Sequence, residues 1–162
     1  MIASQIVAPM EPEIHFRPGL PQDAEAIRSL TRAAYAKWVP LIGREPLPMA
    51  VDYDRAVREH AFDLLLIEGR LAALIETRLE PDHLWVENVA VAPEQQRNGL
   101  WRRLLEHAER KAAAAGRAEL RLLTNAAFTG NVGLYQAIGY TVTRTEEFRG
   151  STVVYMSKRI SA

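Results

Sequence analysis

The stretch that decides the fold reads Val89-Ala90-Val91-Ala92-Pro93-Glu94-Gln95-Gln96-Arg97-Asn98-Gly99-Leu100-Trp101-Arg102-Arg103-Leu104-Leu105. Valines alternate with alanines at its start, as in a half-buried strand, and Pro93 ends that pattern. From Leu100 onward apolar residues recur at helical spacing, which predicts a helix that begins near Asn98. The first N–H groups of a helix have no intrahelical partner, and Gly99 keeps a Cβ out of their path. This junction is therefore a candidate phosphate site.

Length and composition indicate one domain, which we place at residues 13–162, after a flexible arm at residues 1–12. The 20 basic and 20 acidic residues cancel, which argues against nucleic acid as a partner. The lack of cysteine excludes disulfides and a cysteine acyl-enzyme, and the four histidines are too widely spaced for a local metal motif. No metal site is therefore expected. Neither a membrane span nor a leader is evident, so we expect a cytoplasmic protein.

Hydrophobic periodicity predicts a mixed α/β sheet of six to seven strands with about four helices. Strands are expected near residues 14–16, 62–67, 71–79, 83–92, 119–124, 140–148 and 151–158, and helices near residues 23–35, 53–60, 98–115 and 131–138. The second to fourth strands should form an antiparallel meander, and the crossover helix should make the fourth and fifth strands parallel. The apolar loop between the first two helices either packs on the core or walls a pocket.

The parity of the apolar residues changes within the fourth strand. Leu84 and Val86 occupy even positions, whereas Val89 and Val91 occupy odd ones. One extra residue at Glu87-Asn88 would produce this change, so we predict a β-bulge there, although burial on both faces gives a similar pattern. A bulge would force the central parallel pair apart and leave backbone groups unpaired.

Two motifs resemble those of the GNAT superfamily of N-acetyltransferases. Gln96-x-x-Gly99-x-Trp101 is similar to its acyl-CoA pyrophosphate signature, although the family has Gly or Ala in place of Trp101. Asn131-x-x-x-Tyr135-x-x-x-Gly139-Tyr140 is similar to its second motif. The order of elements also agrees over roughly residues 14–160. The resemblance implies a mostly antiparallel mixed (α+β) sheet whose central parallel pair is splayed, with acetyl-CoA as co-substrate.

The resemblance also implies how acetyl-CoA is held, with its pyrophosphate on the helix mouth and its pantetheine beside the fourth strand as a pseudo-strand. Tyr135 would donate a proton to the CoA thiolate, and Asn131 would bond the pantetheine arm or cap its helix. The ring of Trp101 is expected to point away from the phosphates into the contact between helix and sheet. The implied coenzyme contacts are Val89, Ala90, Val91, Gln96, Arg97, Asn98, Gly99, Leu100, Trp101, Asn131 and Tyr135.

A base and an acceptor site complete the implied machinery. Glu87 is the predicted base, because it lies on the central strand beside the bulge; Glu119 and water alone are the alternatives. The family places acceptor contacts after its first strand, which here implies an aromatic and acidic lining suited to a cationic amine. The implied acceptor contacts are Tyr35, Trp38, Met49, Asp52, Tyr53 and Asn88.

The first interpretation is an N-acetyltransferase that moves an acetyl group from acetyl-CoA directly to a primary amine of a small molecule or peptide. A second is a non-catalytic acyl-CoA-binding sensor or interaction module on the same fold, which Trp101 favours. A third is a phosphate-binding domain of unrelated function. Edge pairing of the final hairpin would allow a homodimer.

Overall fold

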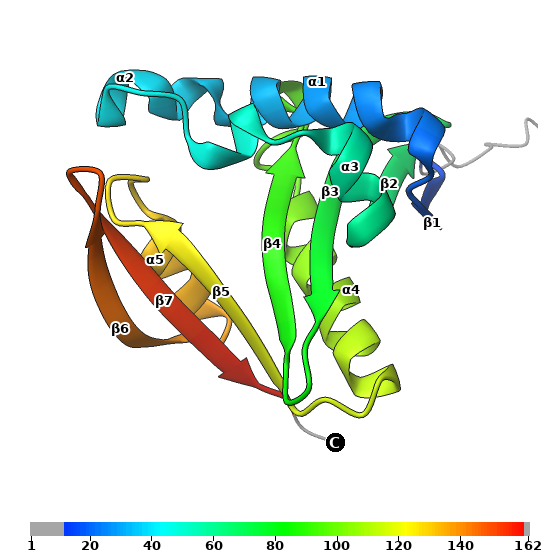
Figure 1. Cartoon of the computed structure of the whole chain (residues 1–162). Coiled ribbons are helices and arrows are strands. Elements are labelled where there is room, and N and C mark those ends of the chain that lie inside the picture. Colours follow the sequence, from blue (N-terminus) through cyan, green and yellow to red (C-terminus); the bar gives the residue numbers. More distant parts are fainter. Residues whose placement is uncertain (1–11, 161–162) are drawn as a thin grey trace, which may run out of the picture.

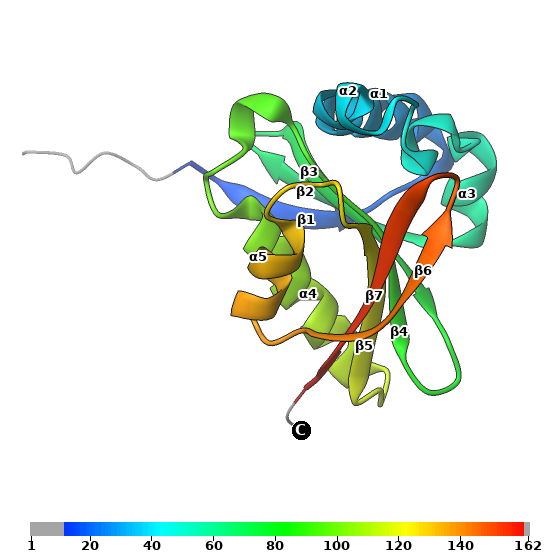
Figure 2. The same cartoon turned by 90° about the vertical axis from the view of Figure 1, so that its left-hand side faces the viewer.

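The computed structural model describes residues 12–160 and shows a seven-stranded mixed sheet with helices on both faces (Figures 1 and 2). The strands are β1 (Ile14–Pro18), β2 (Ala61–Ile67), β3 (Arg70–Leu79), β4 (Leu84–Val91), β5 (Glu119–Asn125), β6 (Thr141–Phe148) and β7 (Ser151–Arg159). The α-helices are α1 (Ala24–Tyr35), α2 (Val39–Ile42), α3 (Tyr53–Glu59), α4 (Leu100–Ala114) and α5 (Asn131–Ala137). The 3-10 turns are η1 (Pro21–Asp23), η2 (Ala36–Trp38), η3 (Leu47–Ala50) and η4 (Pro93–Gln95). The flexible arm expected at residues 1–12 lies outside the described residues, apart from its last residue.

The strand order is β1-β2-β3-β4-β5-β7-β6, and every neighbouring pair is antiparallel except β4 and β5. The predicted meander and the predicted parallel pair are both confirmed. Only two residue pairs join β4 to β5, Leu84 with Leu120 and Trp85 with Arg121. Figure 1 shows these strands diverging from a shared end, so that the sheet splits into two wings.

The predicted bulge in β4 is confirmed at Glu87. Glu76 of β3 lies opposite Asn88, and the next β3 residue, Thr77, lies opposite Val86, which leaves Glu87 without a partner. Because of this extra residue, the even-numbered apolar residues before it and the odd-numbered ones after it face the same side of the sheet. The β4 valines on both sides of the bulge therefore pack in the same core cluster, under α4.

Helix α4 holds the sheet from one side through a stripe of buried residues. These recur at intervals of three and four along the helix and are Leu100, Leu104, Leu105, Ala108 and Ala112. Each leucine removed from water contributes about 2 kcal/mol of transfer free energy. The helix begins two residues later than expected, because Arg97 and Gly99 have φ angles of 73° and 77°, which a right-handed helix cannot contain.

Helices α1 and α3 cover the opposite face of β2, β3 and β4 in a second apolar cluster that includes Ile27, Tyr53 and Ala90. The segment between these helices, expected as an apolar loop, folds into α2 and η3. The segment both packs on the core and walls a cavity, since Met49 is buried in the core and other residues of the segment line the cavity.

Residues 12–160 contain neither a membrane-spanning helix nor a metal-binding cluster. Within that range no helix combines the length and apolarity needed to cross a bilayer. The same residues hold no group of three or more His, Asp or Glu side chains arranged to bind a metal ion.

Candidate active site

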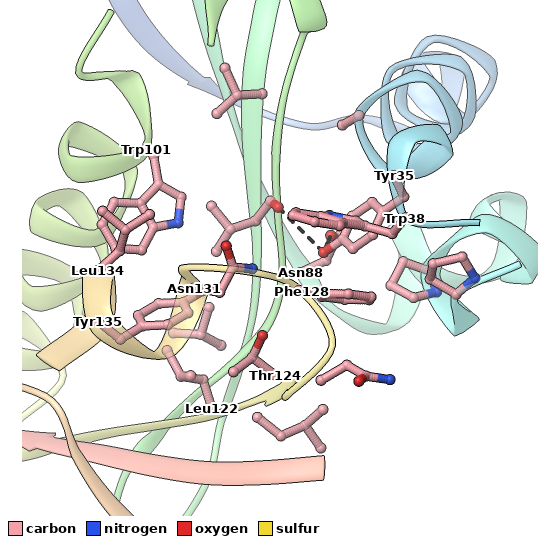
Figure 3. Close-up of a pocket in the computed structure, with 18 of the residues that line it drawn as sticks. Tyr35, Trp38, Asn88, Trp101, Leu122, Thr124, Phe128, Asn131, Leu134 and Tyr135 are labelled. Carbon is pink, nitrogen blue, oxygen red and sulfur yellow. Dashed lines mark hydrogen bonds between the residues drawn. The ribbon is translucent and has the colours of Figure 1, made fainter. Parts of the chain in front are cut away.

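A cavity of about 680 Å³ lies where β4 and β5 diverge, within the range of about 300–1,000 Å³ typical of small-molecule sites. It runs from the mouth of α4 to the segment that joins α2 to η3. Figure 3 shows Trp101, Leu134 and Tyr135 on one side and Tyr35, Trp38 and Phe128 on the other. The cavity gathers most of the predicted site residues: Tyr35, Trp38, Glu87, Asn88, Val89, Val91, Gln96, Arg97, Gly99, Leu100, Trp101, Asn131 and Tyr135.

The open edge of β4 forms one wall of this cavity. Beyond Trp85 no β5 residue pairs with β4. Side chains meet some of the exposed carbonyls instead: Gln96 Nε2 donates to Val91 O at 3.2 Å, and the Tyr35 hydroxyl lies 3.4 Å from Val89 O. Because buried backbone groups need partners, an amide-rich ligand arm can pair here as an added strand would.

The mouth of α4 forms the anionic end of the site. Within residues 12–160, no hydrogen-bond acceptor meets the backbone N–H groups from Arg97 to Arg102, and the first bond of the helix runs from Arg103 N to Gly99 O at 3.2 Å. Nearby, Lys37 Nζ donates to Gln96 Oε1 at 2.8 Å. Burial and, second, the charge of Arg97 lower the pKa of Lys37. Free N–H groups, the helix dipole and these cations favour a phosphate group.

Substitution of Gly99 tests the helix mouth. The φ of 77° costs an L-residue about 1 kcal/mol, and a Cβ would enter open space on the cavity side. We expect Gly99→Ala to lower the melting temperature by about 2–4 °C. Because the Cβ enters ligand space, it should also weaken binding of acetyl-CoA, the ligand that the resemblance implies, by about tenfold in titration calorimetry.

Gly116→Ala is the matched control. Gly116 has a φ of 72° just after the other end of the same helix, has nothing within 4 Å of a Cβ, and does not line the cavity. It should lose the same stability while keeping the affinity for acetyl-CoA. Equal affinity in the two variants would show that the helix mouth is not the binding site.

Tyr135 and Trp101 meet at the centre of the site, with ring centroids 4.9 Å apart. Trp101 also packs against the core cluster, and it lines the cavity together with Arg97 and Gly99 of the helix mouth. Burial raises the pKa of Tyr135 to about 12, so the phenol keeps its proton at neutral pH. Tyr135 is thus a hydrogen-bond donor at the wall of the cavity.

A buried polar network fixes Asn88 next to the bulge. The Tyr35 hydroxyl donates to Asn88 Oδ1 at 2.9 Å, and Asn88 Nδ2 lies 3.4 Å from Thr31 Oγ1 and 3.5 Å from the Tyr53 hydroxyl. Tyr53 in turn donates to Pro48 O at 2.6 Å. Burial raises the pKa of both tyrosines, so each remains a donor. The network holds the side chain of Asn88 rigidly against the cavity.

The two carboxylates considered as a base lie in different places. Glu87 lines the cavity, where it accepts from Trp85 Nε1 at 2.5 Å and lies 3.4 Å from Arg78 Nη2. Glu119 does not line the cavity and is paired with Arg121 at 3.0 Å, a contact that lowers the pKa of Glu119. Of the two, only Glu87 is among the residues that line the cavity.

Besides Asp52, four predicted site residues lie outside the cavity lining. Met49 and Tyr53 are core residues, with 7% and 0% of their surface exposed. Ala90 packs on the α1 side of the sheet, because side chains alternate along a strand and its neighbours Val89 and Val91 pack on the α4 side. Asn98 turns outward to Gln95, at 3.1 Å.

Two further expectations about side-chain roles need correction. Asp52 caps α3, accepting from the backbone N–H groups of Asp54 and Arg55, and it does not line the cavity, so the expected acidic contact with the acceptor is wrong. Gly130 occupies the cap position of α5, and Asn131 makes no capping bond. Asn131 lines the cavity instead.

Several lining residues had no sequence signal. Phe128 sits in a stretch that reads as a polar loop, yet its ring stacks on Trp38 with centroids 4.9 Å apart. The contacts from β5 exist only because the strands diverge, which is a tertiary event. The lining residues that the sequence did not single out include Lys37, Arg44, Leu122, Leu123, Thr124, Phe128, Leu134, Phe148 and Val153.

The chain is similar to several known proteins. It is 36% identical over 72 residues to the ribosomal protein bS18 alanine N-acetyltransferase of Escherichia coli K12, a match covering 44% of this chain and 49% of that protein. The chain thus spans about half the length of the curated relatives it matches.

Two solved structures share the fold. The PaiA N-acetyltransferase from Thermoplasma acidophilum, in complex with coenzyme A, gives a TM-score of 0.77 at 18% identity over 91% of this chain and 99% of that chain. The E. coli ribosomal-protein-S18-alanine N-acetyltransferase gives 0.72 at 22% identity over 93% and 96%. Residues 25–140 match the acetyltransferase (GNAT) family, whose acyl donor is acetyl-CoA. The chain therefore belongs to the acetyltransferase (GNAT) family.

Proposed function

We propose that this protein transfers an acetyl group from acetyl-CoA directly to a primary amine of a small molecule or peptide, with both substrates bound together. The observation that carries the proposal is the cavity in the sheet, which joins free helix N–H groups, an unpaired strand edge and a protonated tyrosine. Without a cysteine in the chain, no cysteine acyl-enzyme can form.

The residues present fit acetyl-CoA at both ends of its polar chain. The N–H groups from Arg97 to Arg102 would hold the diphosphate, and the open edge of β4 at Val89 and Val91 would pair with the pantetheine amides. Acetyl-CoA supplies an acetyl group activated as a thioester. Asn131, on the α5 side of the cavity, offers an amide to the same arm.

Tyr135 would stabilise the sulfur as the carbon–sulfur bond breaks. With a pKa of about 12, the phenol binds its proton more tightly than an ordinary thiolate of pKa about 8.5 does. Tyr135 therefore serves best as a hydrogen-bond donor to the developing thiolate, which needs no complete proton transfer. Such charge-assisted bonds are about twice as strong as neutral ones.

Glu87 would accept the proton that the amine loses as the carbon–nitrogen bond forms, directly or through water. Glu87 is the bulged residue of β4 and lines the cavity next to the part of β4 that β5 leaves unpaired. Asn88, fixed by Tyr35, would orient the incoming amine. That proton then becomes available to neutralise the thiolate, so the reaction needs no other acid.

A thermal-shift measurement with acetyl-CoA, combined with a thiol-release assay, tests the proposal. The amine panel includes small amines and a peptide that begins with alanine, the residue in the name of the E. coli relative. At a hundredfold excess over its dissociation constant, acetyl-CoA should stabilise the protein by about 2.7 kcal/mol. We expect that stabilisation together with amine-dependent thiol release. Stabilisation without release would indicate a non-catalytic binding module. If acetyl-CoA causes neither stabilisation nor thiol release, acetyl-CoA is not a ligand of this protein and the proposal is wrong.

A further inference from the structure

Arg44 lines the cavity and forms no ion pair with any of the described residues. It follows α2 and lines the cavity with apolar neighbours from the same segment, Ile42 and Pro46 to Pro48. Its Nε is buried and has no hydrogen-bond partner among the described residues. Among the described residues, the one hydrogen bond of its side chain is a 3.5 Å approach of Nη1 to the carbonyl of Glu45, at the limit of hydrogen-bond length.

The nearest carboxylate in the sequence is held elsewhere. Glu45 Oε1 pairs with Arg32 Nη2 at 2.8 Å, and Arg32 also donates to Met49 O at 2.7 Å. These contacts tie the segment after α2 to helix α1 and direct Glu45 away from its neighbour. Within residues 12–160, no Asp or Glu carboxylate lies within 4.0 Å of the Arg44 guanidinium.

The other lining cations lie at the opposite end of the site. Lys37 bonds Gln96, and Arg97 and Arg102 belong to the helix mouth, where a diphosphate would bring negative charge. The carboxylate among the lining residues is Glu87, which is already bonded to Trp85 and Arg78. A partly buried guanidinium with an unbonded donor is costly unless an acceptor completes it, and a carboxylate completes it best because it also balances the charge. A ligand bound in the cavity can bring such a carboxylate to Arg44.

The walls around Arg44 limit what that ligand can be. Phe128, Phe148 and Val153 also line the cavity, and Figure 1 shows the tip of the β6–β7 hairpin beneath α2. A single guanidinium balances one negative charge, whereas a phosphate dianion would keep a second charge in an apolar wall. The planar fork of arginine matches a carboxylate.

We propose that Arg44 determines acceptor specificity by binding the carboxylate of an amino-acid-like acceptor, an aromatic or long aliphatic amine that also carries a carboxylate. The inference rests on the proposed acetyl transfer and names its substrate class. The amine reaches the thioester beside Asn88, the apolar body packs against the stacked pair of Trp38 and Phe128, and the carboxylate ends on Arg44. This assignment replaces the cationic acceptor expected from sequence, because Asp52 caps α3 instead of lining the site.

Matched acceptor pairs test this inference. Phenylalanine, tyrosine, leucine and ε-aminocaproate are each compared with the corresponding carboxamide, and kcat/KM is measured by thiol release. We expect the wild-type protein to prefer acids over amides by at least about tenfold, as for a charge-assisted bidentate bond. Arg44→Ala should lower kcat/KM for acids about tenfold while leaving amides unchanged, and Arg44→Lys should keep part of the preference.

Arg58→Ala is the control variant, since Arg58 is an exposed arginine on α3 outside the cavity. It should leave the acid-to-amide ratio unchanged. The ratio is internal to each protein, so partial unfolding of a variant does not alter it. Equal use of acids and amides by the wild type, turnover of amides or peptides alone, or an unchanged ratio in Arg44→Ala overturns the inference and leaves acetyl transfer standing. Absence of turnover with every amine overturns the proposed function itself.

Discussion

Tyr135→Phe should lower kcat for acetyl transfer about a hundredfold, the loss typical when one donor to a developing negative charge is removed. The phenol is buried at the centre of the cavity, and no other Tyr hydroxyl lines that side of it. Acetyl-CoA affinity should change little, since the ring and its contact with Trp101 remain. Stopped-flow thiol release gives kcat, and calorimetry gives the affinity.

The pH dependence follows from the same group. Burial raises the pKa of Tyr135 to about 12, so the donor form persists throughout the neutral range and is lost only as pH approaches that value. The folded-state pKa lies above the unfolded value of about 10, so Tyr135 contributes stability that is complete below pH 10 and declines above it. Tyr135→Phe should therefore leave the shape of the rate profile between neutrality and pH 9 unchanged.

Tyr140→Phe is the matched control for Tyr135→Phe. The Tyr140 ring lies 5.4 Å from the Tyr135 ring, and its hydroxyl is buried without a hydrogen-bond partner among the described residues. Removing that hydroxyl should leave kcat unchanged and keep or raise the free energy of unfolding. If Tyr135→Phe changes kcat no more than Tyr140→Phe does, Tyr135 has only a packing role.

The central part of the fold could be predicted because its signals are local. Four apolar residues of β4 change from even to odd positions, and this change predicts the bulge that the structure has at Glu87. Gly99 and the stripe that starts at Leu100 mark the start of α4 to within two residues. These features depend on chain stereochemistry and on which face is buried, both of which a single sequence records.

The acceptor half of the site could not be predicted in the same way. The segment from Trp38 to Asp52 has no periodicity, so nothing distinguishes the buried Met49 from the cavity-lining Leu47. Leu122 and Thr124 line the cavity only because β4 and β5 separate. That separation is a tertiary feature, since it depends on parts of the chain that are distant in sequence. The prediction that Asp52 contacts the acceptor is wrong for a different reason, since an Asp just before a helix is a preferred capping residue.

Glu87→Gln should lower kcat/KM about a hundredfold, within the range lost when a general base is removed, and should flatten the acidic side of its pH profile. Glu87 lies at the bulge and is among the residues that line the cavity, and the bonds of its carboxylate to Trp85 and Arg78 hold it in place. Gln keeps the shape and can still accept from Trp85, but it cannot take a proton from the amine. An arylamine acceptor, already uncharged near neutrality, keeps its own titration out of the profile.

Two controls identify what the Glu87→Gln result means. Glu80 lies 3.9 Å from the same Arg78 but outside the cavity, so Glu80→Gln tests loss of the ion pair alone and should leave the profile unchanged. Glu119→Gln tests the other carboxylate, which the structure keeps away from the cavity and bonded to Arg121. A flattened profile in Glu119→Gln instead would move the base to β5, whereas unchanged profiles in all three variants would leave water as the proton acceptor. Since the bulge places only Glu87 on the cavity wall, we expect the profile to change in that variant alone.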